Sequence, residues 1–313
     1  MSVLSIVVPV YYNEDNLIPL YNDLYEKVLT KLDKEDDYEI VMVDDGSQDN
    51  SWNVMSDLAK KDNKIHCIRL SRNFGEHAAN LCGFSNSIGD CAVLKAADLQ
   101  EPSEIILEMF ESWKKGNNVV LAVRKDREEG FSQKLFSNTY YWLVRKLALK
   151  NMPKTGFDRY LLDRKVIKAL ELLDEKNSSL QLQILWCGFK TDCIYYVRKQ
   201  REIGKSKWTL AKKVKLVVDS LVSFSFAPIK FITFIGFASF VLSCIWGIKV
   251  LIDKFTGKIA VAGYTSLAIL ILAFSGLILL TLGILGEYIW RSMDASRNRP
   301  VYIVEEEDLN RKK

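Results

Sequence analysis

A short segment rich in carboxylate and amide groups follows a buried apolar run near residue 98. Residues 92–94 (AVL) indicate the end of a strand, and Pro102 indicates the start of a helix. Open α/β sheets bind ligands outside the carboxyl ends of their strands, so we expect Asp98 at the mouth of a cleft. Its carboxylate, with the amide oxygen of Gln100, suits a hard divalent cation that bridges protein and phosphate oxygens. The alternative is that Asp98 only caps the following helix.

The elements that must position Asp98 alternate between strands and helices. Residues 2–10 (SVLSIVVPV) are a continuous apolar run, as expected of a parallel strand buried on both faces. A helical pattern follows, and residues 38–44 then form a strand that ends in Asp44 and Asp45, which completes a βαβ unit. The chain has no G-x-G-x-x-G turn or G-x-x-x-x-G-K-[ST] loop, which disfavours dinucleotide binding of the Rossmann type and P-loop chemistry. The same pattern predicts helices at 51–61, 76–88 and 131–149 and strands at 64–70 and near 119–123.

Composition excludes several classes of protein. The chain has 313 residues, 49% of them hydrophobic, so it can bury a large core. A net charge of +4 without a basic stripe argues against nucleic acid as a partner. The six cysteines are scattered, which predicts neither a zinc site nor a disulfide framework. The first residues form a strand pattern rather than a signal peptide, so we expect the N-terminal part in the cytoplasm.

Four short motifs together resemble a known family. They are residues 8–14 (VPVYYNE), 43–49 (VDDGSQD), 71–75 (SRNFG) and 97–102 (ADLQEP). In this order they resemble family 2 glycosyltransferases of the GT-A fold, and more narrowly polyprenyl-phosphate hexosyltransferases such as dolichyl-phosphate mannose synthase and bactoprenol glucosyltransferase. Each motif alone is weak evidence. The four in order are specific, and the resemblance continues to the C-terminus.

The resemblance implies a nucleotide pocket lined by Pro9, Tyr11, Glu14, Asp44, Asp45 and Asn73. A carboxylate at a strand end, Asp44 or Asp45, can accept hydrogen bonds from an imide N–H or a ribose hydroxyl. The alternative for Asp45 is a turn that leads into a helix capped by Ser47 or Asp49.

Basic side chains that grip phosphate are the second expectation from the resemblance. It implies this role for Arg124 and Arg127, and guanidinium forks do suit phosphate oxygens. Residues 201–208 (REIGKSKW) match the family's basic loop, in which three cations would neutralise a diphosphate leaving group and an incoming phosphate. These cations are Arg201, Lys205 and Lys207. The alternative is a solvated charge run around Arg124 and Arg127 and a simple basic surface loop at 201–208.

A second acidic position follows Gly156, where the resemblance implies that Asp158 faces the acceptor. A lipid phosphate is already anionic at about pH 7 and needs no general base. We therefore expect Asp158 to orient the acceptor or to ligate the cation. The alternative is that Asp158 caps a helix over residues 160–173, while Asp163 and Arg164 serve structure.

The last third of the chain has the pattern of a membrane attachment. Residues 209–227 combine lysines with apolar side chains, as in an interfacial helix. Two uncharged stretches, about 229–252 and 264–288, are each long enough to cross roughly 30 Å of hydrocarbon. Basic flanks favour a cytoplasmic catalytic domain (1–208) and tail (291–313), with a transmembrane hairpin over 228–290. The alternative is a buried helical pair of a soluble protein.

The sequence thus predicts a membrane-bound glycosyltransferase of mainly parallel α/β fold. It would move a hexose with inversion from a nucleotide sugar, UDP-glucose or a similar donor, to undecaprenyl or another polyprenyl phosphate. Mg²⁺ or Mn²⁺ held by Asp98 and Gln100 would assist, although Ala96 replaces the acid that most relatives carry. The alternatives are an amino-sugar, pentose or GDP-mannose donor, or a non-catalytic membrane scaffold. The sequence leaves a homo-oligomer open.

Overall fold

The structure is a computed structural model. It describes residues 1–124, 131–173, 179–196, 227–256 and 263–307, together with 220, 222, 224 and 225. The chain divides into two compact units. One unit contains Met1–Ser220 and Arg299–Lys313, and the other contains Leu221–Asn298.

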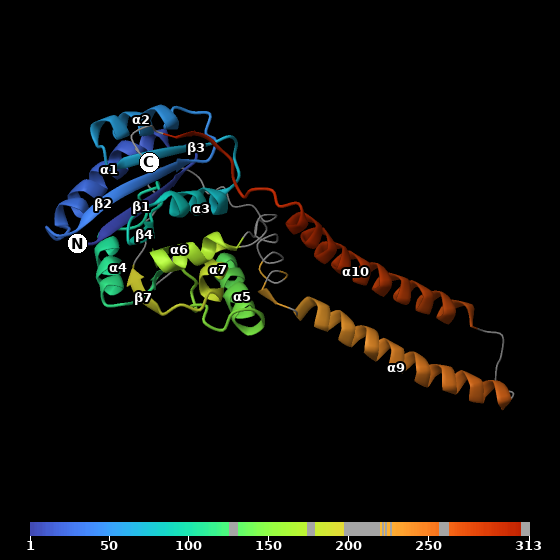
Figure 1. Ribbon diagram of the computed structural model, residues 1–313. Helices are drawn as coiled ribbons and strands as arrows, with labels where there is room; N and C mark the ends of the chain where they lie inside the picture. Colours follow the sequence, from blue (N-terminus) through green and yellow to red (C-terminus); the bar gives the residue numbers. More distant parts are fainter. Residues whose placement is uncertain are drawn as a thin grey trace. The chain divides into compact units, whose positions relative to one another are not determined.

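The first unit is built around an eight-stranded sheet of order β7-β5-β6-β4-β1-β2-β3-β8 (Figure 1). Its strands are β1 Val3–Val10, β2 Asp37–Asp44, β3 Ile65–Leu70, β4 Cys91–Leu94, β5 Val119–Arg124, β6 Arg159–Asp163, β7 Thr191–Tyr196 and β8 Val304–Glu307. Its helices are α1 Glu14–Lys27, η1 Leu29–Lys31, α2 Ser51–Lys61, α3 Glu76–Asn86, α4 Ile105–Lys114, α5 Phe131–Leu147, α6 Arg164–Glu171 and α7 Leu180–Trp186. Six strands are parallel, whereas β6 and β8 run antiparallel to their neighbours. The predicted mainly parallel α/β fold is therefore confirmed.

The central strands are buried because their sequences are continuous apolar runs. Val8 of β1 and Met42 of β2 are partners in the parallel register, and both are fully buried. Amphipathic helices cover the sheet with their apolar sides, as Leu17, Leu20 and Leu24 of α1 illustrate. These buried side chains hold the strand ends in fixed positions.

Strand β6 explains how distant polar residues reach one edge of the sheet. It runs antiparallel between β4 and β5, with Val93 opposite Leu161 and Ala122 opposite Arg159. The amino end of β6 therefore lies beside the carboxyl ends of the parallel strands. The predicted helix over 160–173 is wrong in its first part, because these residues form β6 and the helix begins only at Arg164. Asp163 caps that helix by accepting the Lys165 N–H at 2.9 Å, so Asp158 is not its cap.

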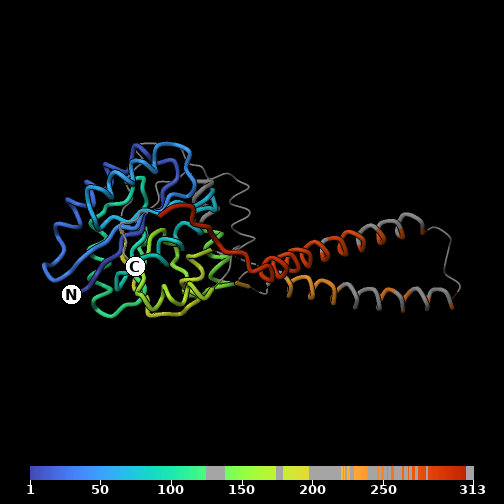
Figure 2. Tube along the Cα trace, turned by 45° about the horizontal axis from the view of Figure 1, so that its top comes forward, coloured from blue at the N-terminus to red at the C-terminus, as the bar shows by residue number. Residues whose placement is uncertain are grey.

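The C-terminal segment is part of the sheet, which the sequence did not predict. Strand β8 pairs antiparallel with β3, with Ile68 opposite Glu307, and the Ser71 N–H donates to the Ile303 carbonyl at 3.0 Å. In Figure 2 the red C-terminal segment returns to the strands of the first unit. Residues 304–307 thus cover an edge strand that would otherwise be open.

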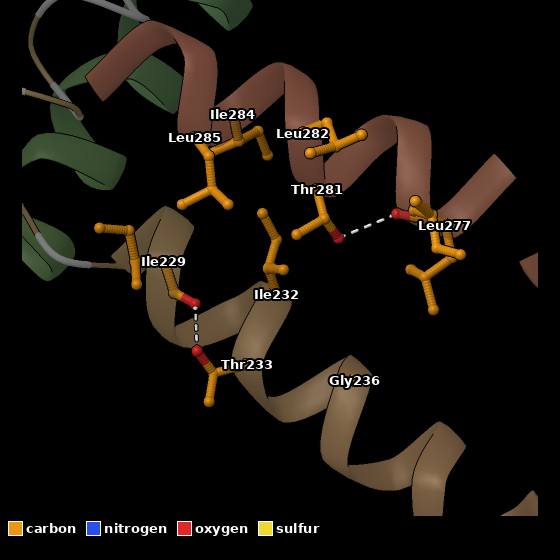
Figure 3. Close-up of a pocket in the computed structure, with 10 residues that line it drawn as sticks. Ile229, Ile232, Thr233, Gly236, Leu277, Thr281, Leu282, Ile284 and Leu285 are labelled. Carbon is orange, nitrogen blue, oxygen red and sulfur yellow. Dashed lines mark hydrogen bonds between the residues drawn. The ribbon is translucent and has the colours of Figure 1, made fainter. Parts of the chain in front are cut away.

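The second unit contains the long helices α9 (Ala227–Phe255) and α10 (Tyr264–Ser296). A hollow of about 480 Å³ lies between them, lined mainly by isoleucine and leucine side chains (Figure 3). The hydroxyls of Thr233 and Thr281 turn back to carbonyls of their own helices at 2.9 Å, so their donors are satisfied without water. In the part of the chain that the structure describes, one stretch, Phe274–Ser296, is long and apolar enough to cross a membrane, and α9 gives only the shorter Ile229–Ala238.

Candidate active site

The candidate site lies where the carboxyl ends of the parallel strands meet the amino end of β6. We divide it into two sides. The β1–β3 side comprises the loops after β1, β2 and β3, and the β4–β7 side comprises the ends of β4, β5 and β7 and the start of β6. Among the predicted site residues, Arg127, Arg201, Lys205 and Lys207 lie outside the described residues, as does most of the predicted interfacial helix 209–227.

The loop after β1 is fastened to the segment that leads from β2 into α2. Tyr12 has a positive φ of 55°, and its N–H donates to Ser47 Oγ at 3.0 Å. Glu14 Oε2 accepts the Asn50 N–H at 2.7 Å, just before the first turn of α2. Pro9 lies within β1, and the Tyr11 side chain is 36% exposed at its end. The loop is thus preshaped, and Tyr11 presents a ring to solvent beside the strand ends.

Asp44 at the end of β2 is fully buried. Its Oδ1 accepts the Ser47 N–H at 3.0 Å, and Oδ2 lies 3.6 Å from Arg69 Nε. Burial raises the pKa of Asp44, while the hydrogen bonds from Ser47 and the charge of Arg69 act against this shift. In this arrangement Asp44 closes the turn after β2.

Asp45 holds the next loop through both carboxylate oxygens. Oδ1 accepts the Phe74 N–H at 2.7 Å, and Oδ2 accepts the Gly75 N–H at 2.9 Å. Burial raises the pKa of Asp45, against the effect of these two donors. Gly46, at φ 69°, allows the close approach, since a Cβ there would lie 2.5 Å from the Arg72 carbonyl carbon. Asp45 therefore ties the β2 loop to the start of α3, while the neighbouring Asn73 is exposed.

The loop after β4 carries Asp98 and is closed by a buried amine. Lys95 is only 2% exposed, and its Nζ donates to the Glu101 carbonyl oxygen at 2.6 Å. Leu99 has a positive φ of 55°, and Asp98 Oδ1 accepts the Gln100 N–H at 3.3 Å. Burial lowers the pKa of Lys95, while the nearby Glu101 charge favours the ammonium form. The lysine thus closes a tight loop on which Asp98 is half-buried.

Arg124 and Asp158, which the sequence placed in two separate roles, contact each other. Arg124 Nε forms an ion pair with Asp158 Oδ2, and the Tyr196 hydroxyl donates to the same oxygen at 3.4 Å. Burial lowers the pKa of Arg124, but Asp158 and Tyr196 together outweigh this effect and the net shift is upward. The ends of β5, β6 and β7 are joined at this point.

A second ion pair connects the two acidic loops. Arg159 Nε lies 2.7 Å from Glu101 Oε2, and Arg159 Nη1 donates to the Asp158 carbonyl oxygen at 2.8 Å. Sequence reasoning assigned no role to Lys95, Glu101, Arg159 or Tyr196. The only available signal was the position of charged residues directly beside apolar strands.

The described side chains near Asp98 supply the oxygen ligands that a hard cation prefers, but too few of them to hold the cation alone. Among the described residues, no group of three or more His, Cys, Asp or Glu side chains could hold a metal ion. Asp98 and the nearby Gln100 offer oxygen ligands, which magnesium and manganese prefer. These residues fit a cation that is bound together with a diphosphate rather than one held by the protein alone.

The fold and the site together define a class of protein: an α/β protein with carboxylates and arginines at the carboxyl ends of its parallel strands, where a ligand can bind. Residues 5–166 match the model of glycosyl transferase family 2. The chain is 37% identical over 303 residues to the uncharacterized glycosyltransferase YkcC of Bacillus subtilis (96% of this chain and 93% of that protein). It is 34% identical to the bactoprenol glucosyl transferase of Shigella phage SfV (97% and 98%). The chain therefore belongs to glycosyl transferase family 2, as its motifs predicted.

Solved structures of similar shape have low sequence identity. Glucosyl-3-phosphoglycerate synthase from Mycobacterium tuberculosis, in complex with phosphoglyceric acid, is 14% identical with a TM-score of 0.49, over 71% of this chain and 79% of that chain.

Proposed function

We propose that the protein transfers a hexose from a nucleotide sugar, with UDP-glucose as the first candidate, to the phosphate of a membrane polyprenol. The observation that carries this proposal is the meeting of the Asp98 loop with the Arg124–Asp158 pair at one sheet edge. Near full-length relatives named bactoprenol glucosyl transferases support the choice of acceptor.

The donor would bind across the β1–β3 side with its diphosphate toward Asp98. Asp98 and Gln100 would hold Mg²⁺ or Mn²⁺ there. When bound, such an ion offsets the negative charge that develops on a departing diphosphate. Arg127 and the cations Arg201, Lys205 and Lys207, which lie outside the described residues, are proposed to neutralise the remaining phosphate charge.

The acceptor phosphate oxygen would attack the anomeric carbon as the bond to the diphosphate breaks, which inverts that carbon. Because the phosphate is already an anion, no residue needs to remove a proton. Asp158 is proposed to fix the direction of the Arg124 guanidinium, whose positive charge then attracts the acceptor phosphate. Their pairing supports an orienting role for Asp158 rather than a role as a base.

Membrane attachment is supported by the second unit. Large apolar side chains such as Phe234 (70%), Leu279 (69%) and Ile289 (68%) are exposed along α9 and α10, which favours contact with lipid. The chain leaves the first unit before α9 and returns to it at β8. Both ends of the intervening segment would therefore stay on one side of a membrane, which supports two crossings, α9 and α10. The basic residues that flank the segment favour the cytoplasm for the catalytic unit.

The test uses the purified full chain in vesicles that contain undecaprenyl phosphate. We expect Mg²⁺- or Mn²⁺-dependent release of UDP from UDP-glucose, together with a glucosylated lipid. UDP-N-acetylglucosamine, a UDP-pentose and GDP-mannose form the donor panel, and undecaprenol without phosphate is the matched control acceptor. Absence of lipid-dependent nucleotide release with every donor would refute the transferase and leave the scaffold alternative.

A further inference from the structure

The Glu101–Arg159 ion pair connects two loops that are 58 residues apart in the chain. Glu101 is 4% exposed, and its Oε1 is buried with no hydrogen-bond partner among the described residues. Arg159 therefore supplies the main compensation for this charge. Burial lowers the pKa of Arg159, but the charges of Glu101, Glu76 and Asp158 together outweigh this effect, so the net shift is upward and the guanidinium stays protonated.

Each partner of the ion pair is also fixed near one of the two acidic residues, Asp98 or Asp158. The Glu101 carbonyl accepts the Lys95 ammonium at 2.6 Å, which closes the Asp98 loop. The Arg159 guanidinium donates to the Asp158 carbonyl at 2.8 Å, which fixes the backbone at that residue. A shift of either loop must therefore displace the other or break a buried ion pair.

We infer that Glu101 and Arg159 are positioning residues that hold Asp98 and Asp158 at a fixed separation for glycosyl transfer. The expected effects on kcat and KM rest on the proposed function. The coupling between the loops can be measured without turnover. Neither residue needs to touch the donor or the acceptor, since both act through the backbone of the acidic loops.

The kinetic test compares Glu101→Gln, Arg159→Met and the double variant with the parent. Each single variant leaves a buried charge or polar group without its partner, so we expect a lower melting temperature. The double variant removes the charge imbalance and should recover most of that loss in melting temperature. Displacement of reacting groups by about 1 Å can cost about 100-fold in rate. We expect kcat of the double variant to stay lowered by about 10- to 100-fold, while the donor KM changes by less than about threefold.

Two further variants separate positioning from general stability. Arg159→Lys keeps the charge opposite Glu101 and should regain part of the lost kcat. Glu39→Gln is the matched control, because Glu39 is a buried carboxylate that accepts the Ser5 hydroxyl at 2.5 Å near the amino end of β2. It should lower the melting temperature without a selective fall in kcat. Recovery of both stability and kcat in the double variant would overturn the inference.

Hydrogen exchange of the full chain tests the coupling even if no transfer is found. Glu101→Gln should speed exchange in residues 155–159, and Arg159→Met should speed exchange in residues 95–101. The Glu39→Gln control should leave both segments as in the parent. If each variant changes exchange only in its own loop, the two acidic loops are independent and the inference fails, whatever the fate of the proposed activity.

Discussion

Asp45 on the β1–β3 side is held differently from Asp158 and Glu101 on the β4–β7 side, whereas Asp44, which accepts the Ser47 N–H and lies 3.6 Å from Arg69 Nε, combines both kinds of contact. On the β1–β3 side, Asp45 binds two backbone N–H groups of the loop that precedes α3. On the β4–β7 side, Asp158 and Glu101 pair with the guanidiniums of Arg124 and Arg159. A carboxylate that is satisfied by backbone donors acts mainly as part of the framework. A carboxylate paired with an arginine sets where a positive charge points, so we expect its loss to affect turnover first.

The largest expected effect is that of Asp98→Asn, which removes the carboxylate proposed to meet the cation. At about 4 Å and an effective dielectric of about 20, one pair of unit charges is worth roughly 4 kcal/mol before desolvation, and a divalent ion doubles this. We expect turnover to fall by about 1,000-fold or more. Ala96→Asp should instead tighten metal binding, because it adds a second carboxylate two residues before Asp98, as the family resemblance implies.

Calorimetric titration of Mn²⁺ with and without UDP, on the parent and both variants, checks this prediction. The parent should bind the ion appreciably only when UDP is present, since water and diphosphate must complete the ligand set. Equal turnover and metal binding in Asp98→Asn and the parent would remove the cation from Asp98 and break the proposed contrast between the two sides.

The second prediction concerns Asp158→Asn. The substitution leaves Arg124 without its charged partner in a largely buried position, and loss of one partner of such a pair costs about 3 kcal/mol or more of stability. We expect kcat to fall by about 100-fold, because the guanidinium is no longer held in one direction. Steady-state kinetics and urea unfolding measure the two effects. An unchanged kcat with full acceptor saturation would mean that the pair serves structure alone.

The central strands and helices, and several polar residues at the strand ends, could be predicted from the sequence because local patterns determine them. Uninterrupted apolar runs predicted β1 and β2, and the helix predicted at 51–61 matches α2, Ser51–Lys61. The same patterns placed Asp98 and Arg124 at strand ends, and parallel strand ends meet on one side of a sheet, whereas Asp158 was identified only through the family resemblance. Their roles toward a ligand remain predictions.

What the sequence did not reveal depends on contacts between distant segments. The pairing of β6 with β4 and β5 has no local signal, and the sequence analysis therefore assigned residues 160–163 to the start of a helix. The sequence analysis assigned residues 291–313 to a cytoplasmic tail, yet the backbone of β8 within that tail pairs with β3. The Glu101–Arg159 pair exists only because β4 and β6 are neighbours, and no local pattern reports such a pairing.

The third prediction tests the framework side with Asp45→Asn. The amide keeps one acceptor but turns an N–H₂ group toward one of the two backbone donors, which costs about 1–3 kcal/mol in a buried position. We expect the free energy of unfolding to fall by that amount, with turnover of the folded protein within about threefold of the parent. Asp49→Asn, at a half-buried acceptor of the Ser51 N–H, is the control with a smaller expected loss.

Urea unfolding and UDP titration distinguish the two roles of Asp45. A fall of about tenfold or more in UDP affinity with unchanged stability would show direct contact with the base or ribose. Asp45 would then bind the nucleotide, as the family resemblance implies, and would not be a framework residue.

The smallest expected effect is that of Glu305→Gln in β8, which extends the comparison to the C-terminal strand. Glu305 Oε2 lies 3.8 Å from Arg69 Nε, and the glutamate side chain is 55% exposed, so water screens the pair. We expect the free energy of unfolding to change by less than about 1 kcal/mol, and less still in high salt. Arg69→Gln is the matched variant, because it also removes the cation beside the fully buried Asp44 and should cost more stability. Equal losses of unfolding free energy in the two variants would mean that the exposed contact in β8, rather than Asp44, anchors Arg69. The β1–β3 side would then depend on the C-terminal strand for its charge balance.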